Sequence, residues 1–167
     1  MVGGNMKIGG YSLREYFRLL APLFGLIGAV WVLRIIVAEA NSPPQIIRIV
    51  SVTTATAFSI ILAVIFFHAR NFGGYTSVFV ASLMLNIWAE LLIIAAILFA
   101  MITHTNNIYT IHPSFPAEAE AATLSHIYTH LTLGIGIGTL GGAAVGFLML
   151  WLLRILVPNK ERDVINL

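Results

Sequence analysis

The stretch that decides the fold is GIGIGTLGGAAVG, which occupies positions 134–146 inside a long apolar run. It repeats a glycine at every fourth position, at Gly134, Gly138, Gly142 and Gly146. Such a segment is a poor helix in water, because each interior glycine costs about 1 kcal/mol relative to alanine. In lipid the helix is enforced, because no water is available to bond the backbone N–H and C=O groups. The stretch therefore predicts a membrane helix with a flat glycine face, on which another backbone can pack closely.

The composition of the whole chain agrees with a membrane protein. Its 167 residues are 59% hydrophobic and only 10% charged, with a mean hydropathy of +0.93, whereas soluble domains carry about 25% charged residues. This length suits one domain. The absence of cysteine excludes disulfides, thiolate metal sites and cysteine nucleophiles. No basic, aromatic-interleaved patch exists, so nucleic acid is not an expected partner.

Four apolar runs predict an all-α, polytopic membrane protein built as a four-transmembrane-helix bundle. Each run exceeds the roughly 20 residues that a bilayer core requires. The spans are expected at about 16–40, 45–68, 76–103 and 128–157.

The ends of this transmembrane domain, residues 12–158, are marked by helix signals. Ser12 and Glu15 have the spacing of a capping box, so the first helix is expected to start at Leu13. Residues 1–11 are glycine-rich and are expected to form a flexible N-terminus, and residues 159–167 a short tail.

The fourth helix is expected to be longer than a membrane crossing. A continuous helix from Ala117 through Val157 would measure about 60 Å, roughly twice the hydrocarbon core. We therefore expect residues 104–127 to form an outer loop and an extension of the fourth helix, which projects from the membrane or lies on it.

Basic residues indicate how the bundle is oriented. With four spans, nearly all Lys and Arg fall on one side, and the opposite loops hold none apart from Arg48 at the edge of the second span. Positive charge favours the cytoplasmic side, so both termini are expected to be cytoplasmic. The basic residues on that side are Lys7, Arg14, Arg18, Arg70, Arg154, Lys160 and Arg162.

The glycine stripe needs a partner, and the second span offers a stripe of small residues with the same spacing. The second and fourth spans run in parallel, so we expect close contact between the two stripes inside the bundle. Alternatives are a contact with a second copy or another membrane subunit, and a flat cofactor on the glycines. The small stripe consists of Ser51, Ala55, Ser59 and Ala63.

Glu90 is the most informative single side chain, because it lies near the middle of the third span. A charge there costs several kcal/mol unless it is paired or protonated. Arg34 is the only other ionisable residue well inside a span, and the two lie at heights of about 20 and 25 Å. We therefore predict an Arg34–Glu90 ion pair, near Asn86. It either fixes helix rotation, or Glu90 handles protons or a ligand, or Glu90 contacts another subunit.

Four of the five histidines are expected on the outer side, which suggests a metal site. His126 and His130 are spaced i, i+4 on a predicted helix, so their rings point from one face and can grip one ion. His104 and His112 could complete the set, with Glu118 or Glu120 nearby. Histidines that simply bridge headgroups and water are the alternative.

A haem or chlorin is a second possibility for these histidines. His104 and His130 fall in the same leaflet on the third and fourth spans, so a bis-histidine haem between them is conceivable. The glycines would give the macrocycle room, but no haem-attachment motif is present.

Three classes of function follow. The chain has no P-loop, GxSxG, HExxH or dinucleotide fingerprint, so an enzyme is not favoured. The first class is a non-catalytic membrane subunit that scaffolds or stabilises a larger complex. The second is a redox or pigment subunit that binds haem, chlorin or a metal, as in electron transport. The third is a small transporter or channel that uses Glu90 and Arg34.

Overall fold

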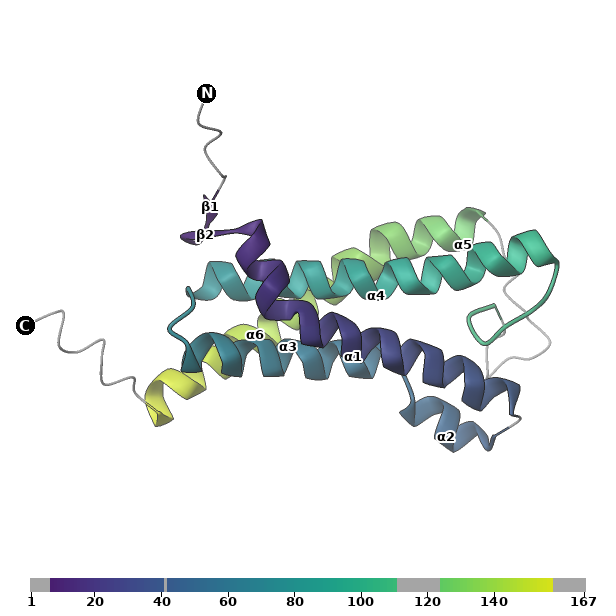
Figure 1. Cartoon of the computed structure of the whole chain (residues 1–167), viewed down its shortest axis with the longest axis horizontal. Helices are drawn as coiled ribbons and strands as arrows, with labels where there is room; N and C mark the ends of the chain where they lie inside the picture. The colour runs from purple at the N-terminus through teal and green to yellow at the C-terminus, as the bar shows by residue number, and fades with distance from the viewer. Residues whose placement is uncertain (1–6, 41, 111–123, 158–167) are drawn as a thin grey trace, which may run out of the picture.

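The computed structural model describes residues 7–40, 42–110 and 124–157, which form a bundle of four long helical segments (Figure 1). Each segment is long and apolar enough to cross a membrane, which confirms the predicted all-α, four-helix architecture. The protein is thus a multi-pass membrane protein in contact with lipid. The four segments are Leu13–Glu39, Pro44–Ala69, Tyr75–Thr103 and Leu124–Leu156.

A small hairpin precedes the first helix, where a flexible N-terminus was expected up to residue 11. Strands β1 (Lys7–Ile8) and β2 (Tyr11–Ser12) pair antiparallel across a two-glycine turn. The hydroxyl of buried Tyr16 donates to the Ile8 carbonyl at 3.0 Å. This contact ties the hairpin to the bundle, while residues 1–6 of the expected flexible N-terminus lie outside the described residues.

Helix α1 (Leu13–Glu39) begins where the capping-box signal placed it. The backbone N–H of Ser12 donates to the Glu15 carboxylate at 2.7 Å. Pro22 lies inside the helix and removes one backbone hydrogen bond, which favours a bend. Figure 1 shows that α1 bends near its N-terminal end and then runs along the bundle.

The second span is broken, although the sequence predicted it as one helix. A short helix α2 (Pro44–Ile49) ends at Val50, and α3 (Val52–Ala69) starts after Ser51, whose backbone is extended. The run Ile-Val-Ser-Val-Thr-Thr at 49–54 is rich in β-branched residues and serine, which favour extended or capping conformations. The second span is therefore α2 and α3 together.

The glycine face of α6 (Ile135–Leu156) packs against α4 (Tyr75–Thr103) and α3. The glycines contact a row of α4 side chains that also recur every four residues. Side chains of α3 lie beside Gly142 and Gly146 as well. A Cβ placed on Gly142 would lie 2.5 Å from Ser82 Oγ, and one on Gly146 would lie 2.6 Å from Val78 Cγ1. The row on α4 consists of Val78, Ser82, Asn86 and Glu90.

The pairing expected between the glycine stripe and the small residues of α3 is corrected. The α3 side chains beside the glycines are Ile60 and Val64, not the predicted small stripe. Ser51 occupies the N-cap position of α3 without a side-chain capping bond, and three further members are buried in the bundle, namely Ala55, Ser59 and Ala63. Adjacent positions on a helix point about 100° apart, so a shift of one residue moves the contact to a different face.

Candidate functional site

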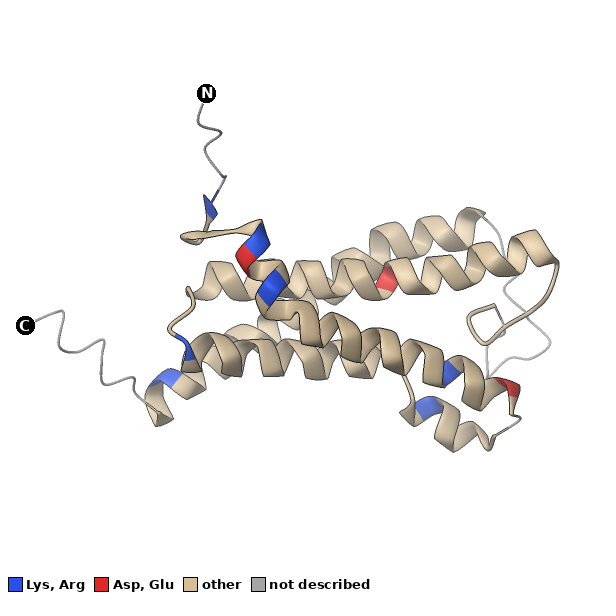
Figure 2. Ribbon diagram, in the orientation of Figure 1, with Lys and Arg blue, Asp and Glu red and all other residues tan. Residues whose placement is uncertain are grey.

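Glu90 lies midway along α4, about 22 Å from the first residue of the helix. Its side chain is only 14% exposed. Figure 2 shows this single acidic position in the centre of the bundle, while the other charged positions gather toward the two ends. Intramembrane carboxylates mark functional sites by default, because an unpaired charge in lipid is costly.

His130 is the partner of Glu90. Its Nδ1 lies 2.6 Å from Glu90 Oε2, a short hydrogen bond that crosses from the fourth span to α4. On the other side of the ring, His130 Nε2 lies 3.2 Å from His126 Nε2. The three side chains therefore form a continuous chain, Glu90–His130–His126. It leads from the middle of α4 to α5, which lies at the end of the bundle opposite β1 (Figure 1).

The helix of the fourth span becomes wider at His130. α5 (Leu124–Thr129) passes into a π-helical segment, η1 (His130–Gly134), before α6 begins. Thr129 and Thr132 donate their hydroxyls to the carbonyls four residues earlier, those of Ser125 and Tyr128. Such back-bonds weaken the regular ladder and favour bending. π-segments of this kind occur frequently at functional sites, and this one begins at His130.

Gly134 makes the approach of the two helices possible. A Cβ at Gly134 would lie 2.7 Å from the Glu90 carboxyl carbon, so only glycine leaves room for the carboxylate at this depth. One turn deeper, Asn86 Nδ2 donates to the Ser82 carbonyl at 2.8 Å, and the Ser82 hydroxyl donates to the Thr139 carbonyl at 3.0 Å. Polar groups thus continue from Glu90 toward the start of α4, along the seam, which is the contact between α4 and the glycine face of the fourth span.

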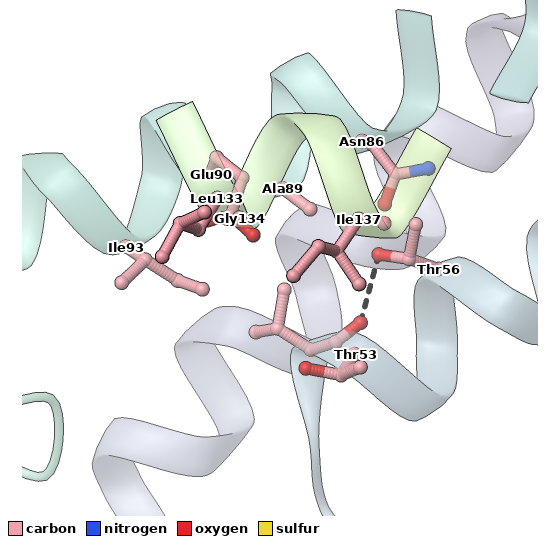
Figure 3. Close-up of a pocket in the computed structure, with 11 residues that line it drawn as sticks. Thr53, Thr56, Asn86, Ala89, Glu90, Ile93, Leu133, Gly134 and Ile137 are labelled. Atoms are coloured by element: carbon pink, nitrogen blue, oxygen red, sulfur yellow. Dashed lines mark hydrogen bonds between the residues drawn. The ribbon is translucent and has the colours of Figure 1, made fainter. Parts of the chain in front are cut away.

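A cavity of about 340 Å³ opens beside Glu90, between α3, α4 and the fourth span. Most of its wall is apolar, and the polar groups are Glu90, Asn86, Thr53 and Thr56. Figure 3 shows Glu90 and Gly134 at one side of this space and the two threonines on α3 at another. Thr56 donates its hydroxyl to the Val52 carbonyl at 2.8 Å. An apolar pocket with a few convergent polar groups is the typical form of a ligand site.

The predicted Arg34–Glu90 pair is replaced by two other contacts. The Arg34 guanidinium lies over the Tyr109 ring, 5.4 Å from its centroid, at the end of α1. Glu90 is bound to His130 instead. Burial raises the pKa of the Tyr109 hydroxyl to about 12, against a smaller lowering by Arg34. Arg34 and Glu90 therefore have different partners, and Arg34 Nε is buried without a hydrogen-bond partner among the described residues.

The four predicted histidines are only partly brought together. His126 and His130 are in contact, whereas His104 caps the C-terminal end of α4 in a left-handed conformation and forms no group of three with them among the described residues. His112, Glu118, Glu120 and the tail 159–167 lie outside the described residues. Within 7–40, 42–110 and 124–157, no three histidines or carboxylates converge on one metal position. His130 contacts Glu90 through Nδ1 and His126 through Nε2, and the haem hypothesis stays a prediction.

Comparisons with known proteins add no assignment. No protein-family model, no curated protein and no solved structure matches the chain. The function must therefore be inferred from this site alone.

Proposed function

We propose that this protein binds a small cation within the membrane and moves it across, with Glu90 as the cation-binding residue. The observation that carries the proposal is the position of Glu90: a carboxylate midway along α4, hydrogen-bonded to His130 and facing a cavity of about 340 Å³. It corresponds to the transporter or channel class expected from the sequence, with His130 in the place of Arg34.

The chemistry of the cavity favours a cation over an anion. Its polar groups are a carboxylate, an amide oxygen and two hydroxyls, and none of its lining residues is Lys or Arg. A carboxylate desolvated by apolar walls is stabilised by a positive ligand. Carboxylate, amide and hydroxyl oxygens can together replace part of the hydration shell of an ion.

The orientation of the bundle in the membrane indicates from which side a cation reaches Glu90. Both described ends of the chain lie at one end of the bundle, and most of the described Lys and Arg positions lie there too, while Arg34 and Arg48 lie toward the other end (Figure 2). Positive charge favours the cytoplasmic side, so we place both termini in the cytoplasm. The His126 end of the site then faces outward, and a cation would reach Glu90 from that side.

Currents from reconstituted protein test the proposal across a series of cations. They are recorded from proteoliposomes on a solid-supported membrane, after exchange into Na⁺, K⁺, NH₄⁺, Mg²⁺, Ca²⁺ or Zn²⁺. We expect a current with at least one of these cations, abolished by Glu90→Gln. The matched control is Glu39→Gln, which removes an exposed carboxylate at the end of α1 and should leave the current unchanged.

Two results would contradict the proposal. The first is the absence of current with every cation in the series, from protein that elutes as a single folded species. The second is a current that survives Glu90→Gln at full size, because the central carboxylate would then have no part in cation movement.

A scaffold subunit is the second candidate, and the outward glycines favour it. Gly25 and Gly28 on α1, and Gly136 and Gly141 on α6, have open space where a Cβ would be. Small residues on outward faces let another membrane helix approach closely. This candidate predicts that stoichiometric partner subunits, or a second copy, co-purify from native membranes in mild detergent. Loss of those partners on Gly28→Leu or Gly141→Leu would support it, and a solitary monomer would contradict it.

A further inference from the structure

We propose that His126 and His130 bind one divalent transition-metal ion through their Nε2 atoms, with Glu90 holding His130 in position. The inference rests on the proposed cation function and deepens it, because it names the class of cation that the site receives. Its starting observation is the convergence of the two Nε2 atoms, which lie 3.2 Å apart.

This separation fits two ligands of one ion. With metal–nitrogen bonds of about 2.0–2.1 Å and a tetrahedral angle, two coordinating nitrogens lie about 3.3 Å apart. The same arrangement places the centroids of the two rings about 5 Å apart, and the observed centroid separation is 5.0 Å. In a straight N–H···N contact of equal length the centroids would be farther apart. The two rings are thus tilted away from a straight N–H···N contact, as two ligands of one ion must be.

Glu90 fixes the chemical form of His130 that a metal requires. An ionised carboxylate can only accept a hydrogen bond, so at the 2.6 Å contact His130 Nδ1–H donates. In the neutral ring the lone pair is then on Nε2, the atom that faces His126. A carboxylate on the far nitrogen of a metal-binding histidine orients the ring and raises its basicity. Without the metal, His126 Nε2–H donates to His130 Nε2. With the metal, His126 carries its proton on Nδ1 and the ion takes the place of that contact.

The local backbone serves the same geometry. The i, i+4 spacing puts both imidazoles on one helix face, and His130 is the first residue of the π-helical segment. The wider turn begins at the residue that must reach both Glu90 and His126. The His130 side chain is 24% exposed, so the bundle does not enclose the ring completely.

The ligand chemistry selects the ion. Two imidazole nitrogens suit Zn²⁺, Cu²⁺, Ni²⁺ and Co²⁺, whereas Mg²⁺ and Ca²⁺ require oxygen ligands. A site with two protein ligands and exchangeable water also releases its ion more readily than a closed four-ligand cage. Capture followed by release is what a translocated ion requires. Glu90 lies next to His130 at the edge of the cavity. Its carboxylate is therefore the oxygen ligand that an ion meets after it leaves the two histidines.

Metal titration of the full-length protein in detergent tests the inference. After treatment with chelator, Zn²⁺ binding is measured by calorimetry, and Co²⁺ binding by the visible absorption of tetrahedral cobalt. We expect one site per chain, unaffected by excess Mg²⁺. His126→Ala and His130→Ala should weaken binding at least about 10-fold, and Glu90→Gln roughly 10- to 100-fold, as for other outer partners of metal-bound histidines.

His104→Asn is the matched control, because it removes an imidazole from the same end of the bundle. Asparagine tolerates the left-handed conformation that position 104 requires, so the fold should be kept and Zn²⁺ binding unchanged. Melting temperatures establish that each variant is folded. His126 lies in the short α5 rather than in the seam, so His126→Ala carries the test if His130→Ala unfolds the protein.

The outcomes separate this inference from the proposed function. Unchanged Zn²⁺ affinity in His126→Ala, or an equal loss in His104→Asn, would overturn the metal site. Glu90-dependent currents of Na⁺ or another cation in the same preparations would then leave the proposed function standing. Conversely, Zn²⁺ binding that requires both histidines, in a protein that passes no current, would overturn only the proposed cation movement.

Discussion

The two halves of the interface between α4 and the fourth span use glycine for opposite purposes. Near the termini, Gly142 and Gly146 lie against Ser82, Val78 and side chains of α3, and the helices are in direct contact. Toward the other end, Gly134 lies against the Glu90 carboxylate and a cavity opens beside it. One repeat of glycines every four residues therefore closes the bundle in one half and makes room for a buried charge in the other.

This difference shows that a small-residue stripe is not one functional unit. Helices in lipid gain little from hydrophobicity against each other, so close van der Waals packing decides how they pair. The closed half supplies that packing. The open half uses the same free space for an ionisable group, which contributes nothing to stability unless it is paired. We therefore expect substitutions in the closed half to unfold the protein and substitutions in the open half to change ligand binding.

The largest effect is expected for Gly142→Leu in the closed half. Even a Cβ there would collide with Ile60 and Ser82, and forced overpacking of a tight contact costs about 3 kcal/mol or more. The neighbouring Gly141 has open space, so Gly141→Leu is the matched control and should leave stability unchanged or raised. The free energy of unfolding in mixed detergent micelles measures both, and equal losses would contradict a closed seam at Gly142.

A smaller effect on stability, but a clear effect on binding, is expected for Gly134→Ala in the open half. The added methyl group pushes the Glu90 carboxylate from its place, while alanine improves helix propensity by about 1 kcal/mol. The melting temperature should change little and Zn²⁺ affinity should fall about 10-fold. Gly136→Ala, which faces open space, is the control. A stability loss as large as that of Gly142→Leu would remove the distinction between the halves.

The face of α4 that packs against α1 is expected to contribute to stability but not to ligand binding. Trp88 Nε1–H donates to the Phe24 carbonyl of α1 at 3.0 Å, and the two rings pack edge to face. Trp88→Phe keeps an aromatic ring but loses this hydrogen bond, so we expect a loss of about 1 kcal/mol in stability. Zn²⁺ affinity and cation currents should match those of the native protein. A changed affinity would mean that the site extends across α4.

The smallest effect at neutral pH is expected for Tyr109→Phe, in the loop after α4. The Tyr109 hydroxyl is buried and has no hydrogen-bond partner among the described residues, so its removal should leave the melting temperature at pH 8 unchanged. The folded protein raises the pKa of this hydroxyl to about 12, above its usual value of about 10. Folding therefore favours the neutral form, and the native protein should lose stability as pH rises from about 10 to 12. The variant should lack this loss, and parallel pH profiles would contradict the assignment.

The helical architecture was predictable because it depends on composition and periodicity. The four spans, the start of α1 and the position of Glu90 near the middle of the third span all follow from local patterns in the sequence. The break between α2 and α3 was missed because hydropathy is continuous across it. Its signal was the β-branched run around Ser51, which hydropathy alone does not register.

The partners of the charged groups could not be predicted, because they depend on helix rotation. Arg34 and Glu90 have similar heights in the membrane, but height leaves the direction of each side chain undetermined. The sequence did contain a usable signal: Gly134 belongs to the seam, and His130 lies one turn before it on the same face. A carboxylate that packs on Gly134 is therefore within reach of His130. Reading the glycine stripe and the histidine pair as one surface would have found this contact.

The most direct test of the account is a double-mutant cycle on Glu90 in unfolding experiments. Glu90→Gln is combined with His130→Gln in one cycle and with Arg34→Gln in another, because residues in contact couple by about 0.5–3 kcal/mol whereas distant ones are nearly additive. The observed 2.6 Å contact between Glu90 and His130 predicts coupling in the first cycle and additivity in the second. Additivity with His130 together with coupling to Arg34 would contradict the site described here.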